Sequence, residues 1–198
     1  MGRDMTDLLS LDATALALIG HDVAMIPDAA MADPTPCDGW TVADLVHHMN
    51  ERHEAIARTA LPPLEPAGDP RDDFALTAAR CLAVLERAGE TVTMPRLGPV
   101  SAEWVLGIHL VDMLVHRWDL ARALCTAVSA APSRITEAAL PLARANTAPG
   151  SPLNVPGGAY RPPLAEDPSR PAVDNLAALL GRDPRWSAPA SSHGTGAA

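Results

Sequence analysis

Apolar residues recur at steps of three and four along almost the whole chain, and this spacing limits the possible folds more than any other feature. Side chains three or four residues apart share one face of an α-helix, so each such stripe predicts an amphipathic helix. Long helices are expected at about 6–26, 41–60, 70–89, 101–124 and 133–146, and a short one at 174–180. Residues 91–98 alternate only weakly and predict a short strand or a loop.

The composition agrees with packed helices. Among 198 residues there are only four tryptophans, one tyrosine and one phenylalanine, so leucine, valine, alanine and methionine must fill the core. That mixture suits helices better than sheets. We therefore predict an all-α fold with a four-helix bundle over residues 5–146. A proline- and glycine-rich extension with one short helix is predicted over 147–186, and a disordered tail over 187–198.

Two helix starts and one interruption can be located from local signals. Thr41 and Asp44 form a capping-box pattern at the start of the second helix, and Asp69 followed by Pro70 is typical of the start of the third. Pro141 is expected to kink or shorten the helix at 133–146.

Charge and cysteine content exclude several classes of protein. The formal net charge is −9, which argues against binding to nucleic acids or anionic membranes, because both need a basic face. No apolar run reaches the roughly 18 residues of a membrane span, and the first residues lack a secretory pattern. Three widely spaced cysteines do not form a disulfide framework. The chain is therefore expected in the reducing cytoplasm.

The predicted helix at 101–124 carries three ionisable residues on one face, His109, Asp112 and His116. They interrupt an otherwise apolar sequence, where such groups are costly unless they are paired or bind a ligand. Asp112 can share a metal with either histidine, whereas His109 and His116 are separated by about 10 Å of helical rise. A hydrogen-bonded ion pair without metal is the alternative interpretation.

A further ligand would have to come from another helix. The helix at 41–60 offers His47, His48 and His53. His48 follows Leu45 by three residues, which predicts that it faces the core, whereas His47 and His53 are expected to face solvent. Cys37 precedes the start of this helix, where a thiolate could be stabilised, although buried packing is the simpler role.

Two segments resemble a known family. Residues 35–48, TPCDGWTVADLVHH, resemble a signature of the form TPC..WTV.DL..H, and residues 109–121, HLVDMLVHRWDLA, resemble D...H.WDLA. Together with LLGRDP at 179–184, they resemble the mycothiol-dependent maleylpyruvate isomerase family of metal-binding proteins. This family lies within the wider DinB-like superfamily, and the resemblance covers most of residues 5–186.

The resemblance implies a DinB-like four-helix bundle that holds a metal, usually zinc, between its helices. Position by position, the family's ligands fall on His48, Asp112 and His116, although the isomerases generally have glutamate where this chain has Asp112. His109 has no fixed role in the family and is expected to act as a base, a substrate contact or a support for the ligands. Arg71 is a candidate for binding a substrate carboxylate. The family also forms pairs, so the resemblance allows a homodimer.

Three functions are compatible with these residues. The first is a zinc- or other divalent-metal-dependent enzyme that activates mycothiol or a related low-molecular-weight thiol for sulfur transfer or double-bond isomerisation of a small electrophile. The second is a thiol-independent hydrolase, lyase, cyclase or isomerase that uses the metal as a Lewis acid. The third is a non-catalytic metal-binding stress or regulatory protein, which predicts a shallow site.

Overall fold

A computed structural model describes residues 5–95, 97–126, 132–154 and 160–189 of the chain. Within these ranges the elements, in chain order, are α1 (Met5–Ala24), the 3₁₀ turn η1 (Asp28–Ala30), α2 (Val42–Ala57), α3 (Pro70–Arg87), β1 (Thr91–Met94), β2 (Gly98–Ser101), α4 (Ala102–Ala123), α5 (Ser133–Thr147) and α6 (Ala172–Leu179). The predicted all-α fold is therefore confirmed. Residues 190–198, most of the predicted disordered tail, lie outside the described ranges.

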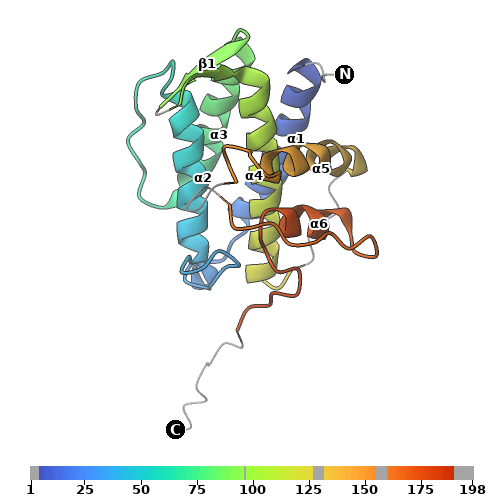
Figure 1. Cartoon of the computed structure of the whole chain (residues 1–198). Helices are drawn as coiled ribbons and strands as arrows, with labels where there is room; N and C mark the ends of the chain where they lie inside the picture. The colour runs from blue at the N-terminus through green and yellow to red at the C-terminus, as the bar shows by residue number, and fades with distance from the viewer. Residues whose placement is uncertain (1–4, 96, 127–131, 155–159, 190–198) are drawn as a thin grey trace.

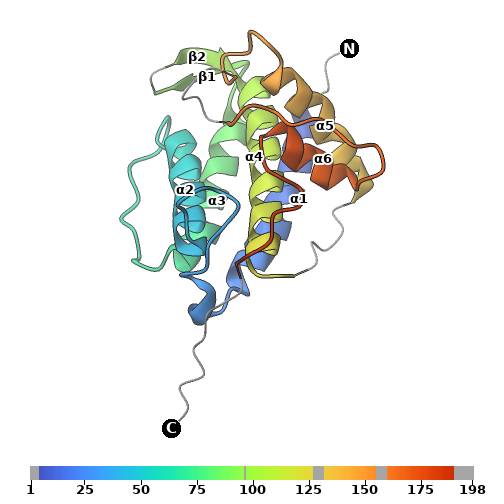
Figure 2. The same cartoon turned by 60° about the horizontal axis from the view of Figure 1, so that its bottom comes forward.

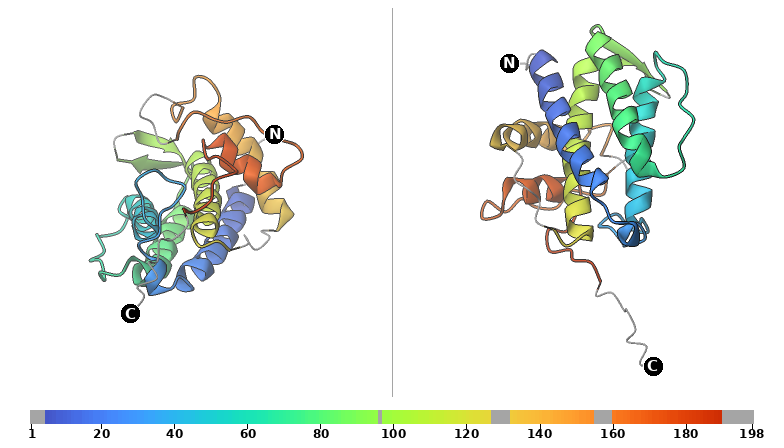
Figure 3. Two further views of the ribbon diagram at one scale, coloured as in Figure 1. Left: turned by 90° about the horizontal axis from the view of Figure 1, so that it is seen from below. Right: turned by 180° about the vertical axis from the view of Figure 1, so that it is seen from behind.

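Within the described ranges, four long helices and two helices that cross them surround the core, and a short hairpin precedes α4. In Figure 1, α2 and α4 run side by side, and α5 and α6 cross α4 at a steep angle on the side away from α2. Helix α1 packs against α3 and α4, and α2 packs against α3. The view from behind in Figure 3 shows α1 lying over α4, with α3 beside it.

Helix α4 is buried on almost every side. Its side chains are apolar around the whole circumference, including Leu106, Leu110, Val111 and Leu114, each at most 3% exposed. A helix that is apolar all round must be surrounded by protein. The polar residues that α4 does carry are therefore held inside the molecule, where they need partners.

The weakly alternating segment is a hairpin. Strands β1 and β2 pair antiparallel with Val92 opposite Val100, and β2 runs directly into α4 through Ser101, whose hydroxyl accepts a hydrogen bond from the Trp104 amide. This connection fixes the hairpin over the first turn of α4.

The helix boundaries agree with the predictions within two or three residues. The shortening expected at Pro141 is not found. Helix α5 continues through Pro141 to Thr147. The proline therefore does not shorten this helix.

Within the described residues, none of the helices combines the length and the apolar character that a transmembrane span requires.

Candidate functional site

A cavity of about 540 Å³ lies between α2 and α4. The segment before α2, the hairpin and the extension that leads into and out of α6 complete its walls. Figure 2 shows two stretches of this extension, in orange and red, lying across α4. Segments far apart in the sequence therefore line one cavity, whose volume lies in the range of ligand pockets.

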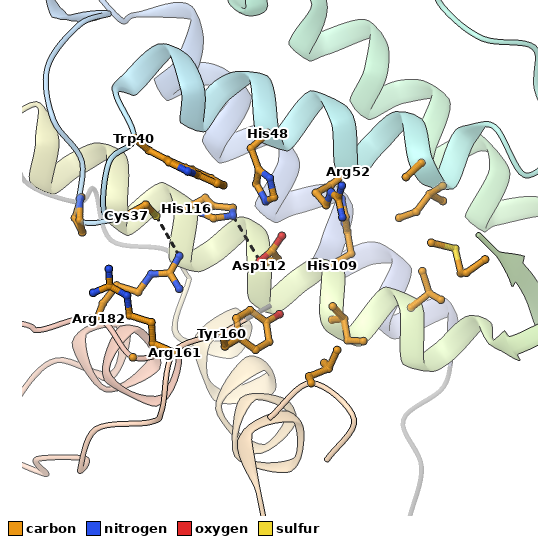
Figure 4. Close-up of a pocket in the computed structure, with 18 of the residues that line it drawn as sticks. Cys37, Trp40, His48, Arg52, His109, Asp112, His116, Tyr160, Arg161 and Arg182 are labelled. Carbon is orange, nitrogen blue, oxygen red and sulfur yellow. Dashed lines mark hydrogen bonds and ion pairs between the residues drawn. The ribbon is translucent and has the colours of Figure 1, made fainter. Parts of the chain in front are cut away.

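The side chains of His48, Asp112 and His116 meet in this cavity. One potential ligand atom from each lies within 4.8 Å of the other two, and Nε2 of His116 is 3.5 Å from Oδ1 of Asp112. Figure 4 shows all three pointing toward one another, His48 from α2 and the other two from α4. The spacing is compatible with a common ion at about 2 Å from each atom. The residue set expected from the sequence therefore comes together in the structure.

The local sequence positions these three groups. The capping box of Thr41 and Asp44 fixes the start of α2, two turns before His48. In α4, the four-residue step from Asp112 to His116 places both side chains one above the other on the face that α2 covers.

The imidazole of His116 is oriented by a second carboxylate. Its Nδ1 donates a hydrogen bond to Oδ2 of Asp119 at 3.1 Å, and Asp119 is completely buried. Its Nε2 is buried and has no hydrogen-bond partner among the described residues. An imidazole that donates through one nitrogen and leaves the other facing a carboxylate and a second histidine is typical of a metal ligand.

Arg182 and Cys37 extend this network. The guanidinium of Arg182 bonds both oxygens of Asp119, at 3.1 and 3.4 Å, and its Nη2 lies 3.4 Å from Sγ of Cys37. Sγ of Cys37 is also 3.4 Å from Asp119. Cys37, His116 and Asp119 form a second group that could hold an ion. In that arrangement Asp119 would be a ligand instead of an orienting group.

Burial and neighbouring charges shift the pKa values of His48 and His116 in opposite directions. Desolvation, reinforced by the nearby His116, lowers the pKa of His48 to about 4. Burial also disfavours a charge on His116, but Asp112 and Asp119 outweigh it and raise the pKa of His116 well above its usual value. Asp112 is desolvated too, yet the two histidines and Arg182 hold its pKa well below the usual range.

His109 lines the same cavity but is held by a different helix. Its Nδ1 lies 2.8 and 2.9 Å from the two oxygens of Asp12 in α1, and both side chains are buried. Burial opposes a positive charge on His109, but Asp12 overcomes it and raises the pKa of His109 well above its usual value. The pair is thus a buried, charged couple with one ring nitrogen, Nε2, on the side of Cys81.

Two residues differ in position from the expectations. Arg71 is not among the residues that line the cavity; its guanidinium bonds Asp69, Asp28 and the carbonyl of Ile26 near the start of α3. The structure therefore gives no support to a substrate contact by Arg71. His53, expected in solvent, is fully buried, because its ring packs between Phe74 and His109. His47 is exposed, as expected.

Several site residues were not singled out from the sequence. Asp12 and Tyr160 carry no spacing signal that links them to the histidines in advance. Asp119 follows His116 by three residues within the WDLA motif, and that spacing could have suggested a partner. Arg182 lies in the LLGRDP motif, but only the fold brings it next to α4.

A family model and a protein relative match the sequence. The model of the mycothiol maleylpyruvate isomerase N-terminal domain matches residues 13–80. An uncharacterised protein of Mycobacterium tuberculosis, found in two strains, is 32% identical over 161 residues; the match covers 78% of this chain and 86% of the relative.

The structure resembles two solved structures of the mycothiol-dependent maleylpyruvate isomerase, one of them a histidine-to-alanine mutant. The TM-score is 0.57 for both, with 16% and 17% sequence identity, and each match covers 73% of this chain and 70% of the isomerase chain. At this identity the likeness concerns the fold.

Proposed function

Because the chain belongs to the mycothiol-dependent maleylpyruvate isomerase family, we propose that it is a metal-dependent enzyme that activates a low-molecular-weight thiol against a small electrophilic metabolite. The observation that carries this proposal is the convergence of His48, Asp112 and His116 in a ligand-sized cavity, with the buried Nε2 of His116 lacking a hydrogen-bond partner among the described residues.

The donor set fits a divalent cation, with zinc as the first candidate. Two imidazoles and one carboxylate are the ligands of many catalytic zinc sites, which keep a further position open. Bound there, the ion would act as a Lewis acid that lowers the pKa of a thiol or of water. The family supports mycothiol as the thiol.

The chain's own residues would supply orientation and a proton. Asp119 fixes the His116 ring through Nδ1, and Arg182 in turn holds Asp119. His109, kept protonated by Asp12, is the proposed proton donor at the cavity wall. Asp12 acts through His109 and is a positioning residue.

The proposed reaction balances without any redox partner. When the thiolate adds to a conjugated double bond, a sulfur–carbon bond forms, and the π electrons move toward the carbonyl oxygen, where the proton on His109 stabilises them. Rotation about the resulting single bond and loss of the same thiolate give the isomer. Transfer of that proton to carbon instead gives a stable thioether.

The two other functions remain alternatives of unequal weight. A thiol-independent Lewis-acid enzyme would use the same three ligands and differs only in needing no thiol for turnover. A non-catalytic protein predicts a shallow site, and a cavity of about 540 Å³ counts against that.

Metal analysis tests the ligand set. We expect close to one equivalent of metal in the purified protein and loss of most of it in His48→Ala and His116→Ala. His47→Ala is the matched control, because His47 neighbours His48 on α2 but is exposed and pairs with Glu51. Equal metal content in all four proteins would refute the ligand assignment.

Thiol binding tests the remainder of the proposal. Mycothiol should bind saturably to the metal-loaded protein and not to the stripped protein, as measured by calorimetry. Binding that is identical in both forms, or absent from both, would favour the thiol-independent alternative.

A further inference from the structure

The polarity of the cavity changes along its length. At one end, His48, His116, Asp112 and Arg182 provide charge and metal-ligating groups, and Arg161 lies beside them. Arg161 is half-exposed and forms an ion pair with the exposed Asp38, so it can exchange that partner for an incoming anion.

The other end is apolar. In Figure 4 the unlabelled side chains beyond Arg52 and His109, away from Arg182, consist of carbon except for one sulfur atom. Six large apolar lining residues come from α2, the hairpin and the first two turns of α4: Ile56, Met94, Leu97, Trp104, Val105 and Ile108.

The order of residues along two helices supports this division. Lining residues on α2 pass from His48 to Ile56 over about 12 Å of helical rise, and those on α4 pass from His116 back to Val105 over about 16 Å. Both helices thus change from ionisable to apolar residues in the same direction along the cavity. The gradient is shared by both helices and does not depend on one side chain.

A compact dicarboxylate does not match such a hollow. It would leave the apolar end filled with water and would gain nothing from the surface of Trp104, Val105 and Ile108. A ligand that buries an apolar body there while its head group lies near Arg161 and Arg182 uses both ends.

We propose that the electrophile taken by this site is amphipathic: a monocarboxylate or carbonyl compound with an alkyl or aryl tail. The head group lies at the metal-ligating end, near Arg161 and Arg182, and the tail lies among the six apolar residues. This inference rests on the proposed function, since it names the substrate class of that same site.

A chain-length series tests the proposal. Unreactive straight-chain carboxylates from butanoate to dodecanoate would be titrated into the metal-loaded full chain by calorimetry. The dissociation constant should fall about three- to fourfold for each added methylene, until the apolar end is full. A constant that does not change with chain length, or tighter binding of butanedioate than of octanoate, would overturn the proposal.

Variants separate the two ends of the cavity. Ile108→Asn should make the dissociation constant depend less on chain length. Val105→Thr keeps the side-chain shape and should have the same effect in a milder form, so it serves as the test if Ile108→Asn folds poorly. Arg161→Gln should weaken the binding of every carboxylate in the series by the same factor, about tenfold. Leu76→Asn is the control for an apolar-to-polar change, because Leu76 is 51% exposed on α3 and outside the cavity. An equal slope in Ile108→Asn, Val105→Thr and the control would place the tail elsewhere.

The outcomes also separate this proposal from the one it rests on. If the protein binds metal but the dissociation constants do not change with chain length, the amphipathic substrate is refuted and the metal-dependent function is not. If the dissociation constants fall with chain length in a protein that holds no metal, the substrate class is supported and the ligand assignment is refuted.

Discussion

The two ring nitrogens of His116 have different partners, and this difference makes the residue the centre of the site. Nδ1 is bound by Asp119, which Arg182 holds in turn, and Nε2 faces Asp112 and His48. Because a carboxylate can only accept a hydrogen bond, Asp119 keeps a proton on Nδ1. Nε2 faces the carboxylate of Asp112 and must give up its own proton before it can bind an ion.

Removing Asp119 should therefore weaken metal binding without removing a ligand. We expect Asp119→Asn to lower the metal affinity about 10- to 100-fold, measured by competition with a chelator of known affinity. Asp38→Asn is the matched control, because Asp38 also lines the cavity but is exposed and bound to Arg161. An unchanged affinity in Asp119→Asn would mean that Asp119 does not orient the ligand.

The buried pair of Asp12 and His109 predicts a pH-dependent stability. The folded-state pKa of His109 is raised, so its contribution to stability is fully present below the unfolded value of about 6.5. It is lost as the pH rises through the folded-state pKa. Asp12→Asn should lower the free energy of unfolding by about 3–5 kcal/mol near pH 6, and by less at alkaline pH.

Urea unfolding over a series of pH values measures this effect. Asp7→Asn, an exposed position on the same helix, should change the stability by no more than a few tenths of a kcal/mol. A penalty for Asp12→Asn that grows with pH would contradict the assigned charge of His109.

At the level of elements, most helices were predictable because their signals are local. The capping box at Thr41 and the start at Asp69-Pro70 are found as expected, since both depend on residues within one turn. Pro141 was expected to kink or shorten α5; it does not shorten the helix, which continues to Thr147 and packs against α4 and α6. The placement of His53 failed, since its burial depends on Phe74 and His109 from other helices.

The end of α6 offers a test of how the extension is attached. Gly181 has φ +80°, and an added Cβ would meet Cβ of Arg161 and, at 3.0 Å, its carbonyl group. Gly181→Ala should therefore lower the free energy of unfolding by about 2–4 kcal/mol, from backbone strain and from displacement of the 161 segment.

A matched glycine separates the backbone strain from the displacement of the 161 segment. Gly150 has φ +87° and open space around its Cβ position, so Gly150→Ala carries only the backbone strain, about 1 kcal/mol. Thermal or urea unfolding of both variants gives the comparison. Equal losses would show that the contact with Arg161 does not hold the extension.

At the level of the whole molecule, the site depends on segments that are distant in the sequence. The family motifs supplied His48, Asp112 and His116, and the structure brings them together. Neither motif could indicate that Arg161 and Tyr160, from the extension, would close one side of the cavity. Asp12 reaches His109 across 97 residues, which no periodicity within one helix can indicate.

Metal should stabilise the folded protein as a whole. At a free metal concentration of 100 times the dissociation constant, the expected gain is about 2.7 kcal/mol, which raises the melting temperature by about 5–10 °C in a chain of this size. The same addition should leave the melting temperature of His116→Ala unchanged. A similar rise in both proteins would indicate that the metal binds elsewhere.

The location of the bound ion is the decisive observation. Anomalous diffraction from crystals of the metal-loaded protein should show one strong peak, about 2.0–2.2 Å from a nitrogen of His48, an oxygen of Asp112 and Nε2 of His116. A peak bound instead by Cys37, Asp119 and Nδ1 of His116, or no peak within reach of these histidines, would contradict the proposed site.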